Sequence, residues 1–128
     1  MSLRGNEDLT MHTYLLLLHE RPADAIDMSP AAMKELVQRY KAWAEDLAAR
    51  GQLAGGEKLT DDGGRHLKLR GGAPLATDGP YAEAQDVIGG YFVIQAASDD
   101  EAQALAATCP HLHGTQWIEI RRIEVLGG

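Results

Sequence analysis

A short run near the N-terminus is apolar at both its odd and its even positions: Thr13-Tyr14-Leu15-Leu16-Leu17-Leu18-His19. Because the side chains of a strand alternate between the two faces of a sheet, this pattern predicts a strand that is covered on both faces. A run this short is typical of a central strand rather than an edge strand. We therefore expect these residues to lie in the middle of a sheet. Other parts of the protein must then cover both faces of that sheet.

Two further segments carry helix signals. In the first, Ser29-Pro30 supplies a capping hydroxyl and a proline at the first turn, and Gly51 follows as a left-handed cap. In the second, Ser98-Asp99-Asp100-Glu101 has capping-box spacing, and Pro110 closes the helix. The first helix also has one apolar stripe at three- and four-residue steps, made of Met33, Leu36, Val37, Tyr40, Trp43, Ala44 and Leu47.

The remaining segments predict strands of unequal strength. Residues 90–96 give the strongest signal, residues 53–59 a weaker one because they contain two glycines, and residues 116–125 alternate as a strand with one wet face. Residues 65–77 predict a hairpin excursion with a half-exposed first strand. The resulting order is β-α-β-β-α-β with a hairpin insertion, the ferredoxin-like arrangement of an α+β fold.

Two helices can cover only one face of such a sheet, although its strands are apolar on both. The other face needs an apolar cover, and a second copy of the chain is the simplest source of one. We therefore expect a homodimer that closes sheet face to sheet face.

Length, charge, apolar runs and cysteine content limit the number of domains, the classes of partner and the location of the protein. The 128 residues fit one domain, placed at residues 11–126 after a polar tail at 1–10 that we expect to be flexible. A net charge of -7 argues against binding nucleic acid. The longest apolar run, Tyr14 to Leu18, is far too short to span a membrane. The single cysteine, Cys109, excludes an intrachain disulfide and favours a cytoplasmic location.

The densest motif lies between the hairpin and the strongest strand. It runs Thr77-Asp78-Gly79-Pro80-Tyr81, then Glu83, then Ile88-Gly89-Gly90-Tyr91-Phe92. Four other segments accompany it: Gly55-Gly56-Glu57, Ser98-Asp99-Asp100-Glu101, Cys109-Pro110 and Ile118-Glu119-Ile120-Arg121. Over residues 11–125 the chain resembles the YCII-related, or DGPF-domain, family, with Tyr81 where the family name has phenylalanine.

The resemblance implies a dimeric α+β barrel, without an established activity. Most members are uncharacterised bacterial proteins, and some are fused to or encoded beside sigma factors. A related chlorinated-hydroquinone dehydrochlorinase and the similar-looking muconolactone isomerases imply proton-transfer chemistry on small molecules. A histidine on the first helix and an aspartate are a proposed active pair in shorter members. Here the helix has no histidine between Ser29 and Gly51, so only the aspartate carries over, and Asp78 is its motif match.

Three residues are candidate catalytic groups. Asp78 has two interpretations: its side chain caps the turn's own amides, or it faces a cleft between sheet and helices as a general base. His19, at the end of the first strand, is either a surface residue or a proton shuttle at the mouth of that cleft. His111 follows Pro110 and is the alternative histidine partner.

Five residues are candidate ligand contacts: Tyr14, Glu57, Tyr81, Glu83 and Tyr91. Tyr14 and Tyr91, with Trp117, fall on strands at positions that can line one common sheet face, where aromatic residues more often form a core or dimer interface. Tyr40 and Trp43 on the first helix are expected to wall any pocket. His111 and His113 alone are a weak metal signal, so no metal and no cofactor is predicted.

Two hypotheses from different classes follow. The first is a small-molecule-binding dimer with lyase- or isomerase-type proton transfer, in which Asp78 is the base and His19 or His111 its partner. The alternative is a non-catalytic regulatory or interaction module, linked to sigma-factor-dependent transcription, in which the motif is a structural turn.

Overall fold

The computed structural model describes residues 10–21, 28–78 and 86–126, with only the backbone at Asp78. In chain order its elements are β1 His12–Glu20, α2 Pro30–Ala49, β2 Leu53–Lys58, β3 Arg65–Arg70, β4 Ala73–Asp78, β5 Val87–Ala96, α3 Asp99–Ala106 and β6 Trp117–Arg122. The expected α+β class is confirmed. The candidate ligand contacts Tyr81 and Glu83, and residues 1–9 of the expected tail, lie outside the described residues.

The main sheet has four strands in the order β2-β5-β1-β6, and each neighbouring pair is antiparallel. β1 is hydrogen-bonded along both edges, so the central strand predicted from residues 13–19 is confirmed. Leu17 lies opposite Tyr91 of β5 on one side and Glu119 of β6 on the other. A bulge between Leu18 and His19 shifts the register with β5 near the end of β1.

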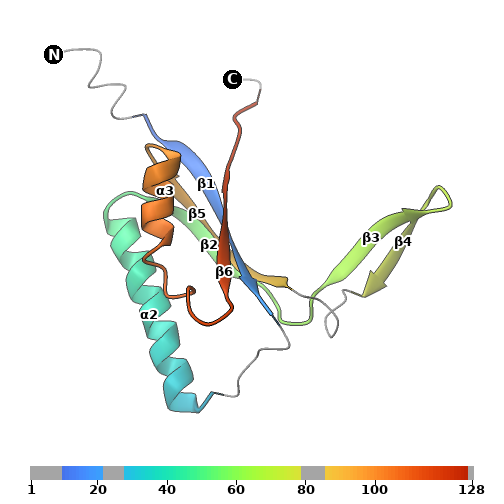
Figure 1. Ribbon diagram of the computed structural model, residues 1–128, viewed down its shortest axis with the longest axis horizontal. Coiled ribbons are helices and arrows are strands. Elements are labelled where there is room, and N and C mark those ends of the chain that lie inside the picture. Colours follow the sequence, from blue (N-terminus) through green and yellow to red (C-terminus); the bar gives the residue numbers. More distant parts are fainter. Residues whose placement is uncertain (1–9, 22–27, 79–85, 127–128) are drawn as a thin grey trace.

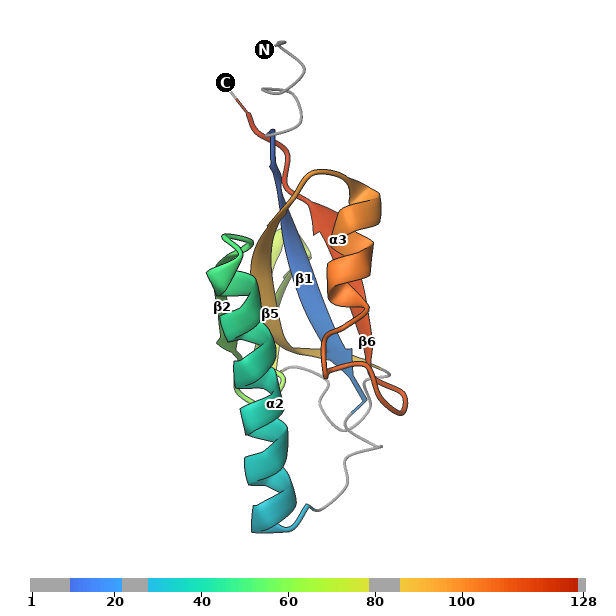
Figure 2. The same cartoon turned by 90° about the vertical axis from the view of Figure 1, so that its left-hand side faces the viewer.

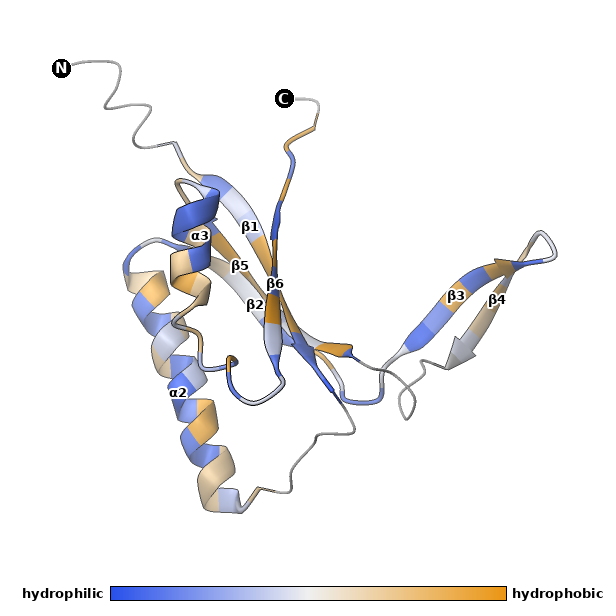
Figure 3. Ribbon diagram, in the orientation of Figure 1, coloured by the Kyte–Doolittle hydropathy of each residue, from blue (hydrophilic) through white to orange (hydrophobic). Residues whose placement is uncertain are grey.

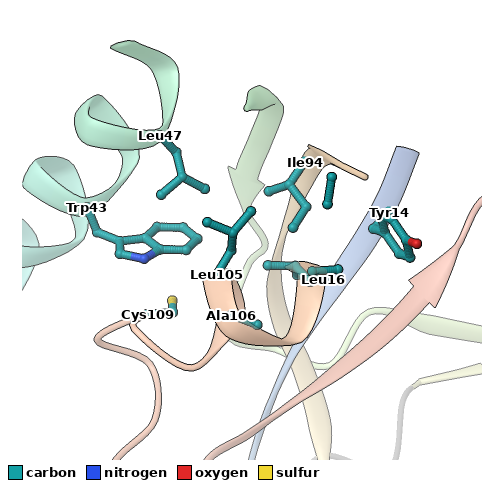
Figure 4. Close-up of a cluster of buried hydrophobic side chains, with 10 residues drawn as sticks. Tyr14, Leu16, Trp43, Leu47, Ile94, Leu105, Ala106 and Cys109 are labelled. Carbon is teal, nitrogen blue, oxygen red and sulfur yellow. The ribbon is translucent and has the colours of Figure 1, made fainter. Parts of the chain in front are cut away.

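Both helices lie against the same face of this sheet (Figures 1 and 2). Between them and the sheet lies a buried apolar cluster, drawn in Figure 4, to which β1 contributes Leu16, β5 Ile94 and α3 Leu105. From α2, Leu47 is 0% exposed and Trp43 packs edge-on against Phe92, with 4.9 Å between ring centroids. This cluster is the core of the described chain, and it uses only one face of the sheet.

The helix starts follow the capping signals of the sequence. The Ser29 hydroxyl accepts a hydrogen bond from the Ala32 amide, and the Ser98 hydroxyl accepts one from the Glu101 amide, each at 3.1 Å. The Glu101 carboxylate in turn accepts a 2.8 Å bond from the amide of Ala97, just before the cap. These bonds satisfy amides that have no partner within the helix.

The other face of the sheet, which we call the open face, has no helix on it among the described residues. Alternation along β1 and β5 places Leu15, Leu17 and Val93 on this face, where each is half-buried. Tyr91 and Trp117 share the open face, because they pair with Leu17 and His19. Tyr14 does not: it is 1% exposed in the core, and its hydroxyl donates a 2.7 Å bond to Asp99. The expected common face for Tyr14 and Tyr91 is therefore wrong.

β3 and β4 form the expected hairpin as a separate two-stranded sheet. Its turn is Gly71-Gly72, and both residues have a positive φ, 61° and 83°, which glycine adopts at little cost. β3 is more exposed than the half-exposed strand expected from its alternation, since Leu67 and Leu69 are 69% and 73% exposed. None of the helices in the described ranges is both long and apolar enough to cross a membrane.

Shortening Leu47 tests the position of the core. Leu47→Ala removes a side chain that is 0% exposed, and we expect a loss of about 2–5 kcal/mol in the free energy of unfolding, measured by urea denaturation. Val37→Ala on the same helix is the matched control. Val37 is 55% exposed, so its truncation should change stability by no more than about 0.5 kcal/mol. Equal losses in the two variants would contradict this placement of the core.

Candidate functional site

A cavity of about 520 Å³ lies between α2 and the sheet, and we call it the helix–sheet cavity. α2 contributes Met33, Leu36, Val37 and Tyr40 to its lining. The sheet contributes Leu18 and Phe92, and the segment after α3 contributes His111 and Gln116. This volume is within the range of ordinary small-molecule sites, which are mostly apolar with a few polar groups at fixed positions.

Three glycines form part of the sheet side of the cavity: Gly56 on β2 and Gly89-Gly90 on β5. A Cβ atom at Gly56 would lie 2.6 Å from the Phe92 ring, and one at Gly90 would lie 3.0 Å from the Glu57 carbonyl oxygen. At Gly89 it would overlap the carboxylate of Glu20. The backbone therefore approaches its neighbours too closely for larger residues, and the absence of side chains leaves room under α2.

His111 lies at the polar end of the cavity and is 3% exposed. Its Nε2 is 2.8 Å from the carbonyl oxygen of His19, which can only accept, so Nε2 carries a proton and donates it. In the neutral imidazole Nδ1 is then an acceptor. It receives bonds from the Tyr40 hydroxyl and the Gln116 side-chain amide, each at 3.0 Å. Tyr40, His111 and Gln116 together are called the His111 cluster.

The protonation states of this cluster follow from its burial. Burial lowers the pKa of His111 below 6.5, while the bond to His19 and the carboxylate of Glu20 act in the opposite direction. Burial likewise raises the pKa of Tyr40 to about 12, with smaller contributions from Cys109 and Glu20. At neutral pH the cluster is therefore an uncharged phenol that donates to an uncharged imidazole.

Charged side chains line the cavity on the opposite side from the apolar α2 residues. They are Glu20, Lys58 and Asp61. The Lys58 ammonium donates to the Asp61 carboxylate at 2.7 Å and to the Leu59 carbonyl at 2.8 Å, so its charge is locally compensated. The remaining carboxylate, Glu20, makes the lining net acidic.

His19 is a neighbour of this cavity through its backbone only. Its side chain lies on the open face, where Nε2 is 3.0 Å from the Glu119 carboxylate. The ring stacks on Trp117 with 3.9 Å between centroids, and the indole of Trp117 donates a 3.2 Å bond to Asp86. The buried Nδ1 of His19 has no hydrogen-bond partner among the described residues. The structure thus joins His19 and His111 by one hydrogen bond but directs their rings to different sides.

The other predicted site residues are distributed over three places. Tyr40, which was expected as a pocket wall, lines the helix–sheet cavity. Glu57 and Tyr91 border it from β2 and β5, but they pair with each other and strand alternation directs both side chains to the open face. Tyr14 is a core residue instead. The backbone of Asp78 ends β4 opposite Arg65, in the hairpin, and its role as a base stays a prediction.

Two residues of the site, Glu20 and Gln116, were not predicted from the sequence. Glu20 reaches the cavity because Gly89, the extra residue of the bulge in β5, has no side chain and leaves space for its carboxylate. Gln116 reaches His111 because the segment after α3 folds back, with the Gln116 amide donating to the His111 carbonyl at 3.1 Å. Neither placement follows from a local pattern. In the described ranges no group of three or more His, Cys, Asp or Glu side chains is arranged to hold a metal ion.

The fold and the cavity define a two-layer α+β protein with one helix-covered sheet face. Within that class the chain belongs to the YCII-related domain family, whose model matches residues 12–125. The family predicted from the motifs is therefore confirmed. No curated protein matches the chain.

The lowered pKa of His111 predicts a specific pH dependence of stability. Below pH 6.5 the unfolded chain binds a proton at this position more readily than the folded chain does, so the free energy of unfolding should fall as the pH drops below that value and level off above it. His111→Gln should flatten this part of the profile, measured by urea unfolding from about pH 5 to about pH 8. His113→Gln, at an exposed histidine, is the control and should keep the slope. An unchanged slope in His111→Gln would contradict the assignment.

Proposed function

We propose that this protein binds a small organic molecule in the helix–sheet cavity and transfers a proton on it, as a lyase or isomerase does. The observation that carries the proposal is the Tyr40–His111 hydrogen bond at one end of a cavity whose α2 wall is apolar. A buried acid–base pair whose partners are fixed by further hydrogen bonds is the arrangement general acid–base catalysis requires.

The proton path follows from the hydrogen bonds. A ligand proton passes to the Tyr40 oxygen while the Tyr40 proton passes to Nδ1 of His111, giving an imidazolium and a deprotonated ligand. The Glu20 carboxylate favours this cation, since its charge already raises the pKa of His111. Return of the proton to a different ligand atom completes an isomerisation with no net proton consumed. Loss of a leaving group from the deprotonated ligand gives an elimination.

The lining selects the class of ligand. Met33, Leu36 and Phe92 offer apolar contact, and the ring face of Phe92 suits a planar or a cationic group. The Glu20 carboxylate disfavours an anion in a partly desolvated site. The favoured ligand is therefore uncharged or cationic, with an apolar ring and one hydroxyl or carbonyl group to meet Tyr40. Phenols and cyclic ketones fit this description.

We propose further that the fold is the ferredoxin-like arrangement and that two copies close into a dimeric α+β barrel. The strand order β2-β5-β1-β6, with both helices on one face, supports the first statement. The half-buried Leu15, Leu17 and Val93 of the open face support the second, because a contiguous apolar sheet face is a common site of contact between proteins.

Filling the cavity tests the binding site. Val37→Trp adds an aromatic ring at an exposed α2 residue that lines the cavity, so it should abolish binding of phenol or cyclohexenone while the melting temperature stays close to that of the unchanged chain. Binding is measured by ligand-observed NMR. Lys34→Trp, at an exposed position outside the cavity lining, is the matched control and should bind normally. Equal binding in both variants would show that the ligand lies elsewhere.

Two conservative substitutions separate the candidate bases. If Tyr40 relays the proton, Tyr40→Phe should slow hydrogen–deuterium exchange of a bound ketone's α-protons about 100-fold or more, with affinity changed far less. Asp78→Asn should then leave the exchange rate unchanged. The reverse result would transfer the role of base to Asp78, as the family resemblance implies. Exchange no faster than in buffer for the unchanged chain would identify a binding module without catalysis.

A further inference from the structure

The β3–β4 hairpin has no extensive packing inside its own chain. Its two strands pair only with each other, and no other described helix or strand packs extensively against them. An isolated two-stranded hairpin is marginally stable in water, because it cannot bury an apolar face. The hairpin therefore needs a surface to pack on that this chain does not supply among its described residues.

One face of the hairpin is apolar. Alternation along β3 places Leu67 and Leu69 on the same side, with Arg65 at the base of that side, and the cross-strand partners of the leucines on β4 are Ala76 and Pro74. Figure 3 shows the alternation of hydrophilic and hydrophobic positions along β3. The exposures of 69% and 73% for the two leucines mean that most of this apolar area is available for contact. We call these two leucines together with Ala76 and Pro74 the hairpin's apolar face.

The direction of the hairpin relates it to the open face. α2 and α3 lie on one side of the main sheet and the hairpin stands out from the other side (Figures 1 and 2). The hairpin and the open face therefore meet at an angle and together form one concave surface. A hollow of about 730 Å³ lies where the hairpin leaves the sheet, lined by His19 and Ile88 from the sheet and by His66, which shares its hairpin face with Lys68 rather than with the leucines. A protein that covers the open face must also lie beside the hairpin.

The charge of the hairpin favours a second copy of this chain as the protein that covers the open face. β3 and β4 carry three basic residues, Arg65, Lys68 and Arg70, against one acidic residue, Asp78, in a chain that has 19 acidic and 12 basic residues in total. The hairpin is thus a basic projection on an acidic protein, and its charge is complementary to that of another copy. Two-fold symmetry then places each hairpin on the other protomer, because the two partners exchange identical contacts.

We propose that the β3–β4 hairpin is a dimerisation arm that packs its apolar face on a second copy of this chain. This inference rests on the homodimer proposed above and adds a second contact surface to it. The arm holds the partner from the side, while the open faces meet at the centre.

Sedimentation equilibrium of three variants tests the arm. Leu67→Glu/Leu69→Glu should raise the dimer dissociation constant about 100-fold, since two leucines lose their apolar contacts and two charges meet the interface. Lys68→Gln, between them on the opposite face of the hairpin, should change the constant only a few-fold. Leu17→Glu, at the open face, should dissociate the dimer independently of the arm. Circular dichroism melting confirms that each variant is folded, and the arm lies outside the core.

The outcomes separate the two proposals. A wild-type mass equal to the 13.9 kDa chain at every concentration would overturn both the homodimer and the arm. A wild-type dimer that Leu17→Glu dissociates and Leu67→Glu/Leu69→Glu leaves intact would overturn the arm alone. As a second readout, Leu69→Cys should react with a maleimide more slowly at dimer-forming concentrations than after dilution, whereas Lys68→Cys should react at similar rates. Equal rates for Leu69→Cys under the two conditions would also overturn the arm.

Discussion

Backbone pairing of β1 along both of its edges is the constraint on which the rest of the structure depends. β5 and β6 are each held to β1 in antiparallel register, so the sequence segments that carry the helices must cross over the same face. Leu16 then packs under the helices and Leu17 points to the opposite side. A single apolar run thus supplies both the core and the face that we propose for dimerisation, which is why the run has no polar side.

The end of β1 also fixes the candidate site. The carbonyl of His19 holds Nε2 of His111, and this bond determines which nitrogen of the buried ring is free to accept from Tyr40. The neighbouring bulge brings Glu20 over Gly89, so that a carboxylate lies close enough to influence both the phenol and the imidazole. The site is therefore organised by main-chain geometry at the end of one strand, and α2 completes it from the other side.

Local signals in the sequence predicted the elements better than their contacts. The caps at Ser29 and Ser98 were readable because each serine acts on amides a few residues away. The face occupied by Tyr14 was not readable, since a strand that is apolar at every position does not show which side the helices cover. The environment of His111 depends on Tyr40, 71 residues away, and on the backbone of His19, 92 residues away, so no local pattern could reveal it.

The glycines beneath α2 have a consequence for how the family can diversify. The sheet side of the cavity includes three glycines on strands whose position is fixed by pairing, whereas α2 forms the opposite wall with its side chains. Exposed residues on a helix can be exchanged at little cost in stability. Substitutions at Met33 and Val37 can therefore change the size and polarity of the cavity while the strands beneath it stay constant, so the fold can present differently shaped cavities without being rebuilt.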